Sequence, residues 1–237
     1  MENIEIKPFE IKKVQKIVES KETQALIECL ALLEIHAETI GEGGNAEILG
    51  IAEGPFSKVC LKRVRETPQI LCNSIDQENE IQGKARRAGV RTPLALISFE
   101  TEDGKKYFIM EKIIGSNLEE ILVDPSKLPD TFSAQTFNTD LDKQIATLHA
   151  AGIYHRDLHT RNVMVNEEGL PVIIDFGTAT EGTGSDLTYQ EYTNVYNPVT
   201  KRYDSVEGMF KDDKVMVRNL KSALAPIVLQ EALTRKN

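Results

Sequence analysis

The 237-residue chain lacks several features that mark particular protein classes. Its three cysteines, Cys29, Cys60 and Cys72, are odd in number and have no Cys-x-x-Cys spacing, which argues against a disulfide framework and a structural zinc site. No run approaches about 18 apolar residues, and the amino terminus is acidic, so neither a membrane span nor a secretory signal is expected. We therefore expect a cytoplasmic protein, or one secreted into a host cell by a route that needs no such signal.

An excess of basic residues is also missing. The formal net charge is -9, which disfavours nucleic acid or an anionic membrane as the main partner, because both call for a basic face. Arg86, Arg87 and Arg91 lie close together, but a solvated helix end explains them more simply than a binding patch. With 41% hydrophobic residues, the chain can form one substantial core or two small lobes that share a cleft.

Hydrophobic periodicity predicts that the chain begins with helix, continues with strands and ends with helices. Apolar residues recur every three and four positions over residues 8–34, which is typical of two amphipathic helices. Alternating apolar residues and turn signals predict two hairpins further along. The predicted hairpin strands are residues 47–52 with 56–64 and residues 94–99 with 107–111. The other predicted helices are residues 74–88, closed by Gly89, then 131–151 and 205–234.

The predicted strands end near Glu111 and the predicted helices resume near Ser116, so a short connector separates them. This order indicates an α+β fold in which a β-rich lobe is joined to a helical lobe, with a ligand-binding cleft at the connector. A partner-binding cap is the alternative for the N-terminal part, although we prefer packing. The expected parts are a helical extension packing on the first lobe (1–36), the β-rich lobe (37–112) and the helical lobe (113–237).

The most informative segment is Tyr154-His155-Arg156-Asp157-Leu158-His159-Thr160-Arg161-Asn162, which is followed by Asp175-Phe176-Gly177. Phosphoryl transfer from ATP needs a carboxylate to orient the attacking hydroxyl, and further oxygen ligands to hold Mg²⁺ on the phosphates. Asp157 and Asp175 offer such oxygens, and the interval between the motifs leaves room for a short strand pair. The two motifs therefore predict an ATP- and Mg²⁺-dependent site.

A glycine-rich stretch, Ile40 to Ile48, precedes these motifs and fits Gly-x-Gly-x-x-Gly-x-Val with two replacements. Glycines allow a backbone to come close to phosphates and to donate N–H groups to them, but a tight hairpin turn uses the same residues. The stretch opens a hairpin and not a helix, which argues against a Rossmann or Walker site. The residues predicted to contact ATP are Gly41, Glu42, Gly43, Gly44, Asn45, Ala46 and Ile48.

Lys62 ends the apolar run Val59-Cys60-Leu61 on the second strand of the first hairpin. Coming about twenty residues after the glycine stretch, it is interpreted as a ligand of the α and β phosphates rather than a residue at the edge of the sheet. Such a lysine needs a carboxylate partner, and the next helix offers Glu78 and Glu80. A shift of two residues turns a helix by roughly 200°, so only one of them can face the lysine, and we favour Glu78.

The connector after the second hairpin is expected to bind the adenine base. Its backbone at Glu111 and Ile113 is predicted to contact the base, with Met110 behind it. Met110 also fits a role in the core, and the two roles are compatible.

Taken in order, these elements resemble the protein-kinase superfamily over residues 40–177. The resemblance implies a bilobal kinase-like fold with a β-rich N-lobe and a helical C-lobe, and ATP and Mg²⁺ as cofactors. The implied roles are base for Asp157, Mg²⁺ ligands for Asn162 and Asp175, and phosphate binding for Lys62 held by Glu78.

The chain departs from typical protein kinases after Gly177, where no Ala-Pro-Glu follows. The resemblance therefore implies a reduced C-lobe, similar to that of compact atypical kinases. These are the RIO kinases, the small kinase of the KEOPS complex, and the minimal kinases that bacteria deliver into hosts.

The acceptor class is left open by His159. We expect a serine/threonine protein kinase with a protein substrate, which for a delivered kinase is a host protein. Serine/threonine kinases commonly have lysine at this position, whereas aminoglycoside phosphotransferases and lipopolysaccharide sugar kinases have histidine, so a small-molecule kinase is the alternative. A loop histidine satisfied by neighbouring carboxylates is equally compatible with this position. A nucleotide-binding pseudokinase that acts as an interaction module is a third hypothesis.

Arg156 is a candidate for binding a phosphorylated activation loop. The hydroxyls that follow Gly177 are those of Thr178, Thr180, Thr183, Ser185, Thr188 and Tyr189.

Overall fold

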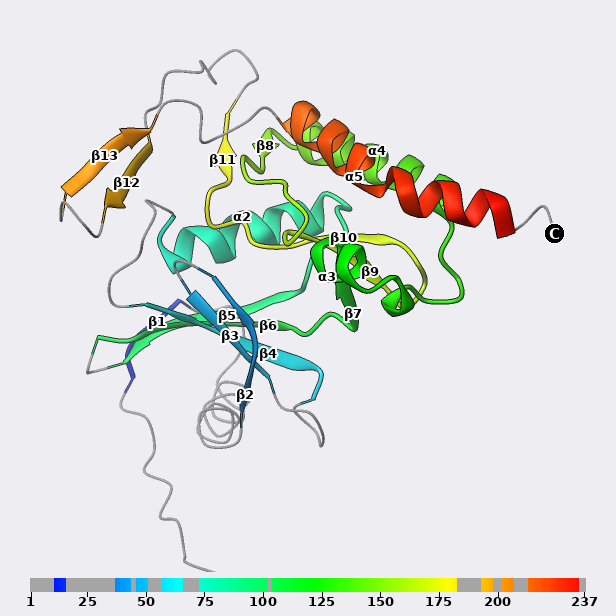
Figure 1. Cartoon of the computed structure of the whole chain (residues 1–237). Helices are drawn as coiled ribbons and strands as arrows, with labels where there is room; N and C mark the ends of the chain where they lie inside the picture. The colour runs from blue at the N-terminus through cyan, green and yellow to red at the C-terminus, as the bar shows by residue number, and fades with distance from the viewer. Residues whose placement is uncertain are drawn as a thin grey trace, which may run out of the picture. The chain divides into compact units, whose positions relative to one another are not determined.

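The computed structural model describes residues 11–15, 37–43, 46–50, 57–65, 73–101, 104–182, 193–197, 202–206 and 213–234 (Figure 1). The chain divides into two compact units, which we describe one at a time. The first unit comprises residues 1–80, 94–112 and 194–204, and the second comprises residues 81–93, 113–193 and 205–237.

The first unit is built on a six-stranded sheet with the order β1-β5-β6-β4-β3-β2, in which neighbouring strands are antiparallel (Figure 1). Its strands are β1 (Ile11–Gln15), β2 (Glu38–Glu42), β3 (Ala46–Gly50), β4 (Val59–Val64), β5 (Ala95–Thr101) and β6 (Lys106–Glu111). The second predicted hairpin is confirmed as β5 and β6, and Gly104 in the connection has a positive φ of 81°. The first predicted hairpin is confirmed as β3 and β4, although residues 51–56 between them lie outside the described residues.

Alternation along the strands sends side chains to two separate cores. Leu61 and Ile109 lie opposite each other in the sheet and join one buried cluster, in which the rings of Phe99 and Tyr107 stack 5.0 Å apart. Because successive strand residues point to opposite faces, Lys62 lies on the other face from Leu61. Ile75, Ala95 and Phe108 form a second cluster.

The prediction of helix over residues 8–34 is wrong at residues 11–15, which form strand β1 and pair with β5. A short apolar spacing of three residues fits either structure, and the edge of β5 offers backbone hydrogen bonds that a helix here would leave unused. The remainder of that range lies outside the described residues. The division into residues 1–36, 37–112 and 113–237 stays a prediction.

Helix α2 (Ile75–Arg87) confirms the helix predicted over residues 74–88. Ser74 and Gln77 form a capping box at its start: each backbone N–H donates to the other residue's side-chain oxygen, at 3.0 and 3.3 Å. Gly89, with φ of +98°, closes the other end, and Val90 N donates to Ala85 O. The boundary between the two units falls within α2, after Glu80.

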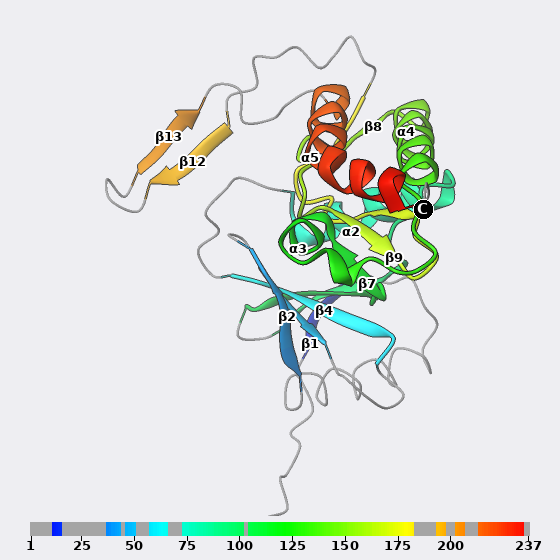
Figure 2. The same cartoon turned by 45° about the vertical axis from the view of Figure 1, so that its right-hand side comes forward.

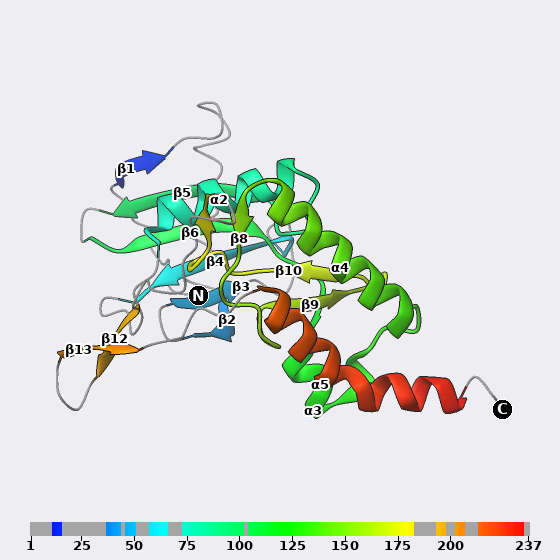
Figure 3. The same ribbon diagram turned by 90° about the horizontal axis from the view of Figure 1, so that it is seen from above.

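The second unit combines helices with two small sheets. Strands β10, β9 and β7 form one antiparallel sheet, and β11 pairs with β8. Its further elements are β7 (Gly115–Asn117), α3 (Leu118–Val123), the 3₁₀ turn η1 (Pro125–Lys127), α4 (Ala134–Ala150), β8 (Ile153–Tyr154), β9 (Val163–Asn166), β10 (Pro171–Ile173), β11 (Thr180–Glu181) and α5 (Asp213–Thr234). The short strand pair expected between the two motifs is β9 and β10, and β10 lies beside α4 (Figure 3).

Helix α4 confirms the helix predicted over residues 131–151, and it carries the core of this unit. One face of α4 is fully buried and packs with the apolar face of α5, so the two helices lie side by side (Figure 2). The buried residues of this face are Phe137, Leu141, Ile145 and Leu148, and those of α5 are Met216, Val217, Leu220, Leu224 and Ile227. This close packing restricts movement of β8 and β10, and thus of the points at which the loops after them begin.

The last helix is shorter than predicted. Ser205 and Val206 belong to strand β13 (Arg202–Val206), which pairs with β12 (Thr193–Asn197), and α5 begins at Asp213. β-Branched and aromatic residues in these two segments favour a hairpin over continued helix. Among the described helices, none is both long enough and apolar enough to cross a membrane.

Candidate functional site

A buried ion pair joins β4 to α2 in the first unit. Lys62 Nζ lies 2.7 Å from Glu78 Oε1, and both side chains are more than 90% buried. Lys62 is held in register between Ile48 of β3 and Phe108 of β6. Glu80, the alternative partner considered from the sequence, is exposed. The structure therefore brings Lys62 together with Glu78, the partner that we favoured, and not with Glu80.

The glycine stretch connects β2 to β3. Gly43 N donates to Ala46 O at 2.9 Å, which closes a tight turn, while Gly44 and Asn45 lie outside the described residues. A Cβ added at Gly41 would approach Ile48 no closer than 3.5 Å, and one at Gly43 would lie 3.6 Å from Ala46 O. These are ordinary contacts, and neither glycine is among the positive-φ residues. The fold alone does not require glycine at either position.

Glu42 and Ile48 flank this turn on neighbouring strands. Glu42 forms an exposed ion pair with Arg65, and Glu47, opposite Glu42, pairs with Arg63 at 2.8 Å. These cross-strand pairs connect β2 and β3 to β4 and its end, and so fix the position of the turn relative to Lys62.

The predicted adenine-binding segment begins at the end of β6. Met110 and Glu111 are half-buried there, and Ile113 follows at the start of the second unit. Cys60, on the same face of β4 as Lys62, donates from Sγ to Glu111 O at 3.7 Å. Burial raises the pKa of the Cys60 thiol to about 12, so the thiol stays protonated and unreactive.

The loop after β8 holds Asp157 in the second unit. Asn162 Nδ2 donates to the backbone oxygen of Asp157 at 2.8 Å and to its Oδ2 at 3.2 Å. His159 Nε2 lies 3.4 Å from the same Oδ2. The structure therefore brings Asp157 and Asn162 together, and the carboxylate of Asp157 is partly exposed.

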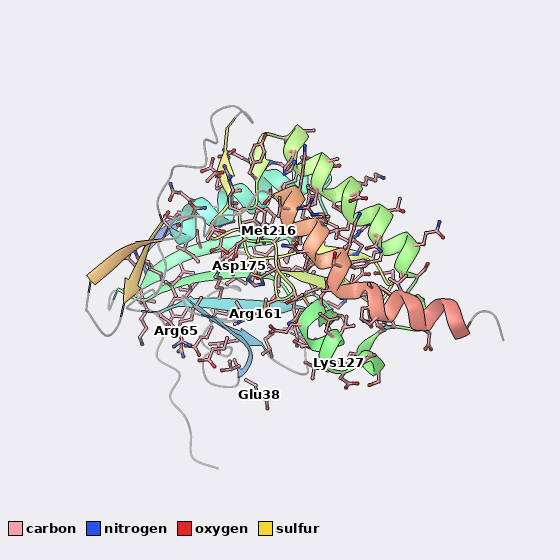
Figure 4. The ribbon with its side chains drawn as sticks, turned by 45° about the horizontal axis from the view of Figure 1, so that its top comes forward. Glu38, Arg65, Lys127, Arg161, Asp175 and Met216 are labelled. Carbon is pink, nitrogen blue, oxygen red and sulfur yellow. The ribbon has the colours of Figure 1, made fainter. Side chains whose placement is uncertain are left out.

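Backbone strain is concentrated at the two motifs. In the described part of the chain, only Arg156 and Asp175 are non-glycine residues with a positive φ, of 69° and 64°. Such a conformation costs free energy, and it persists where the surrounding structure imposes it, often at functional sites. Figure 4 labels Asp175, which follows β10, and Arg161, which lies in the loop after β8.

The loop after β10 is connected to the loop after β8. Ile174 N donates to Asn162 O at 3.0 Å, and Asp175 Oδ1 accepts from Gly177 N at 3.2 Å. Phe176 is fully buried and meets the His155 ring edge-on at 5.0 Å. Asp175, whose side chain is exposed, therefore directly follows Ile174, which is hydrogen-bonded to Asn162.

The predicted Mg²⁺ ligands fit the cation by their chemistry. Asn162 uses Nδ2 for both of its side-chain hydrogen bonds, which leaves its amide oxygen as the ligand atom. Asp175 supplies a carboxylate from the adjoining loop. Oxygen ligands of this kind, few in number and completed by phosphate oxygens, are those that Mg²⁺ prefers.

Asp213, the first residue of α5, forms hydrogen bonds with the start of the loop after β8. Its Oδ2 accepts from His155 N at 2.8 Å and lies 3.0 Å from His149 Nε2, while its Oδ1 accepts from Arg156 N at 2.8 Å. Burial on its own raises the pKa of Asp213, but the hydrogen bond with His149, the charge of His155 and the backbone N–H groups together lower that pKa. The sequence analysis assigned Asp213 no role at this loop, because no spacing links it to partners 57 or more positions away.

Arg156 turns towards the strand pair β8 and β11. Its Nε donates to Thr180 Oγ1 at 3.2 Å, and its guanidinium carbon lies 5.6 Å from the centre of the Tyr154 ring. One hydroxyl of the segment after Gly177 is thus already in contact with Arg156. Thr178 and Thr180 are among the described residues. Residues 183–192, which carry the remaining hydroxyls of this segment, lie outside them.

Residues 35–201 match the protein kinase domain. The serine/threonine-protein kinase chk-1 of Caenorhabditis briggsae is 30% identical over 144 residues, which cover 60% of this chain and 29% of that protein. A probable bifunctional tRNA threonylcarbamoyladenosine biosynthesis protein of Methanospirillum hungatei is 32% identical over 161 residues, covering 66% of this chain and 27% of that protein.

A probable serine/threonine-protein kinase of Clostridium perfringens is 27% identical over 160 residues, covering 62% of this chain and 23% of that protein. The chain therefore spans less than a third of the length of these three relatives. The domain match covers well over half of the chain and includes every predicted site residue, and the α+β fold agrees with it. This chain belongs to the protein kinase family.

Proposed function

We propose that this chain is an ATP- and Mg²⁺-dependent phosphotransferase, and specifically a compact serine/threonine protein kinase. The observation that carries the proposal is the loop in which Asn162 holds the Asp157 carboxylate and is itself bonded to the segment before Asp175. Similarity to proteins named as serine/threonine kinases supports a protein hydroxyl as the acceptor. That the acceptor is a host protein stays a prediction.

The reaction assigns a separate task to each group of residues. The acceptor oxygen attacks the γ-phosphorus, the bond to the β–γ bridging oxygen breaks, and ADP leaves with that electron pair. Asp157 accepts the proton of the acceptor hydroxyl and later releases it to solvent. Proton acceptance requires an exposed, ionised carboxylate, and Asp157 is partly exposed in the loop after β8.

Positive charge near the phosphates comes from two sources in this proposal. Bound Mg²⁺, held by Asn162 and Asp175, would neutralise charge on the transferring phosphate. Lys62 would bind the α and β phosphates, and its pairing with Glu78 keeps the ammonium group in one place while it is buried. The glycine positions also support phosphate binding at this turn. Gly41 and Gly43 leave space beside the backbone, although the fold itself does not require glycine at either position.

A small-molecule kinase is the second candidate. The proximity of His159 to Asp157 favours it, since histidine rather than lysine stands beside the catalytic carboxylate. The two candidates differ in acceptor and not in the transfer step.

The experiment that separates them is an acceptor screen with γ-labelled Mg-ATP. The purified chain is offered generic protein acceptors and, in parallel, a panel of sugars and aminoglycosides. We expect label on protein serine and threonine, and a fall of about 100-fold or more for Asp157→Asn. Asp130→Asn, an exposed aspartate before α4, is the matched control.

Label on small molecules alone would replace the protein kinase with the second candidate. Nucleotide binding without transfer to any acceptor would favour a pseudokinase that acts as an interaction module.

A further inference from the structure

Two hydrogen bonds fix the His159 ring within its own turn. The backbone N–H of Arg161 donates to His159 Nδ1 at 3.1 Å, and Asn162 N donates to His159 O at 2.9 Å. A ring nitrogen that accepts a hydrogen bond carries no proton, so this network assigns the single proton of the neutral ring to Nε2. The ring is therefore oriented with Nε2–H as its donor.

Nε2 also lies near the carboxylate of Asp157. His159 Nε2 lies 3.4 Å from Oδ2, the oxygen that also accepts from Asn162 Nδ2 at 3.2 Å. Within the described part of the chain, Oδ1 of Asp157 has no hydrogen-bond partner. His159 and Asn162 thus both approach Oδ2, and Oδ1 is left without a hydrogen bond from either.

The turn that carries His159 is itself tied down. Glu119 N, at the start of α3, donates to Thr160 O at 3.1 Å, and Ile174 N donates to Asn162 O at 3.0 Å. The position of the ring relative to Asp157 is thus set by α3 and by the loop after β10. The 3.4 Å separation of Nε2 and Oδ2 is a contact and not a formed hydrogen bond, and catalytic hydrogen bonds that are long or poorly aligned in a free enzyme often form fully only in the complex with substrate.

We propose that His159 is a positioning residue: its Nε2–H, together with Asn162, holds Oδ2 of Asp157 so that Oδ1 meets the acceptor hydroxyl. The inference rests on the proposed function, in which Asp157 accepts the proton of that hydroxyl. The proton moves from the acceptor oxygen to Oδ1 while this oxygen forms its bond to the γ-phosphorus and ADP leaves. His159 takes no proton and forms no bond with substrate.

A neutral donor suits this task better than a cation. An ammonium group at 3–4 Å would stabilise the ionised carboxylate and lower its affinity for the proton, whereas a neutral N–H orients it with a smaller effect. The Arg161 side chain does not supply that charge to Asp157, because its Nε lies 3.7 Å from Glu119 Oε2.

Three substitutions separate the donor role of Nε2 from the acceptor role of Nδ1. His159→Gln keeps an N–H donor where Nε2 lies, His159→Asn keeps only an acceptor for Arg161 N–H, and His159→Ala keeps neither. We expect kcat to fall about tenfold to 100-fold in His159→Asn and His159→Ala, with the KM values for ATP and acceptor unchanged. In His159→Gln we expect kcat within about threefold of the wild type.

The inference is overturned if His159→Ala keeps the wild-type kcat, or if the loss is the same in all three variants. An NMR measurement of the ring ¹⁵N shifts decides the geometry independently of activity. We expect the neutral Nε2–H tautomer for the signal that disappears in His159→Gln, and the Nδ1–H tautomer would contradict the proposal. A wild type that transfers no phosphate would defeat the proposed function, while the tautomer would still decide between the two geometries.

Discussion

At the scale of single residues, Lys62 shows how burial decides between two candidate partners. Glu78 and Glu80 are two positions apart on α2, and only Glu78 is buried against the lysine. An ion pair taken out of water has lost its hydration, so each member depends on the other for compensation. Removing the charge of Glu78 therefore leaves Lys62 buried without its main partner.

We therefore predict that Glu78→Gln lowers the free energy of unfolding by about 3–5 kcal/mol. Glu80→Gln, on the same helix but exposed, should change it by no more than about 0.5 kcal/mol. Urea denaturation of the two variants measures both values. Equal losses would show that Glu78 has no special part in the fold of the first unit.

The structure brings predicted site residues into contact where the signal was local. Glu78 was favoured over Glu80, with the helix period allowing only one of the pair to face Lys62, and Asn162 is five positions from the aspartate that it bonds. Asp213 could not be found in this way, because its partners at His155 and Arg156 are brought to it only by the packing of α4 on α5. Contacts between distant positions depend on tertiary structure, which periodicity does not report.

At the scale of elements, some glycines are required by the fold, whereas those of the turn between β2 and β3 are not. Gly115, at the start of β7, has φ of 145°, and a Cβ there would lie 2.0 Å from Val165 O. That position requires glycine for the fold. Gly41 and Gly43 have neither constraint, so another cause is needed for glycine there.

We predict that Gly41→Ala and Gly43→Ala leave the melting temperature unchanged or slightly higher, because alanine reduces the entropy of the unfolded chain. The Kd for Mg-ATP should rise about tenfold, since a methyl group at the turn keeps the backbone N–H groups away from the phosphates. Calorimetric titration and thermal unfolding provide the two readouts.

Gly115→Ala is the contrasting variant, and it should fold poorly because of the clash with Val165 O. Unchanged nucleotide affinity in both turn variants would mean that the stretch is a hairpin turn without a ligand.

Elements were predicted well where alternation or helical spacing ran over many residues. The α4 face from Phe137 to Leu148 repeats over three turns, and β5 and β6 are mainly buried runs on either side of a turn that contains Gly104. Residues 11–15 were assigned to helix, because a few apolar positions do not distinguish helix from a strand added to the edge of β5. Pairing across the sheet overrides a weak local preference.

At the scale of the whole molecule, Asp213 couples the stability of the fold to pH. It accepts hydrogen bonds from two backbone N–H groups and contacts His149, and these contacts favour its ionised form. Its pKa in the folded chain is lower than its ordinary value of 3.8. Its contribution to stability is therefore fully present above that value and is lost as the pH falls through the lower, folded value.

We predict that Asp213→Asn destabilises the chain by about 1–3 kcal/mol near neutral pH, because an amide N–H then opposes a backbone N–H. The difference from the wild type should stay constant down to about pH 4 and shrink below it. Urea denaturation between about pH 7 and pH 2.5 measures this dependence. A difference that does not change with pH would show that the charge of Asp213 is not what stabilises the loop.

The family and the order of its motifs were predictable from the sequence, because each motif carries its own chemistry over a few neighbouring residues. Asp157 and Asp175 were named for their oxygens and Asn162 through the family resemblance, and the loop after β8 brings Asp157 and Asn162 together. The strained φ of Arg156 and Asp175 was not predictable, since it is imposed by Asp213 and by the buried Phe176 rather than by local preference.

Single-turnover transfer of γ-phosphate from Mg-ATP tests the central claim most directly. The wild type, Asp157→Asn and Asp130→Asn are compared with the acceptor that the screen identifies. The account predicts equal transfer by the wild type and Asp130→Asn, and a rate at least about 100-fold lower for Asp157→Asn with unchanged nucleotide binding. Transfer by Asp157→Asn at the wild-type rate would contradict the assignment of Asp157 as the base.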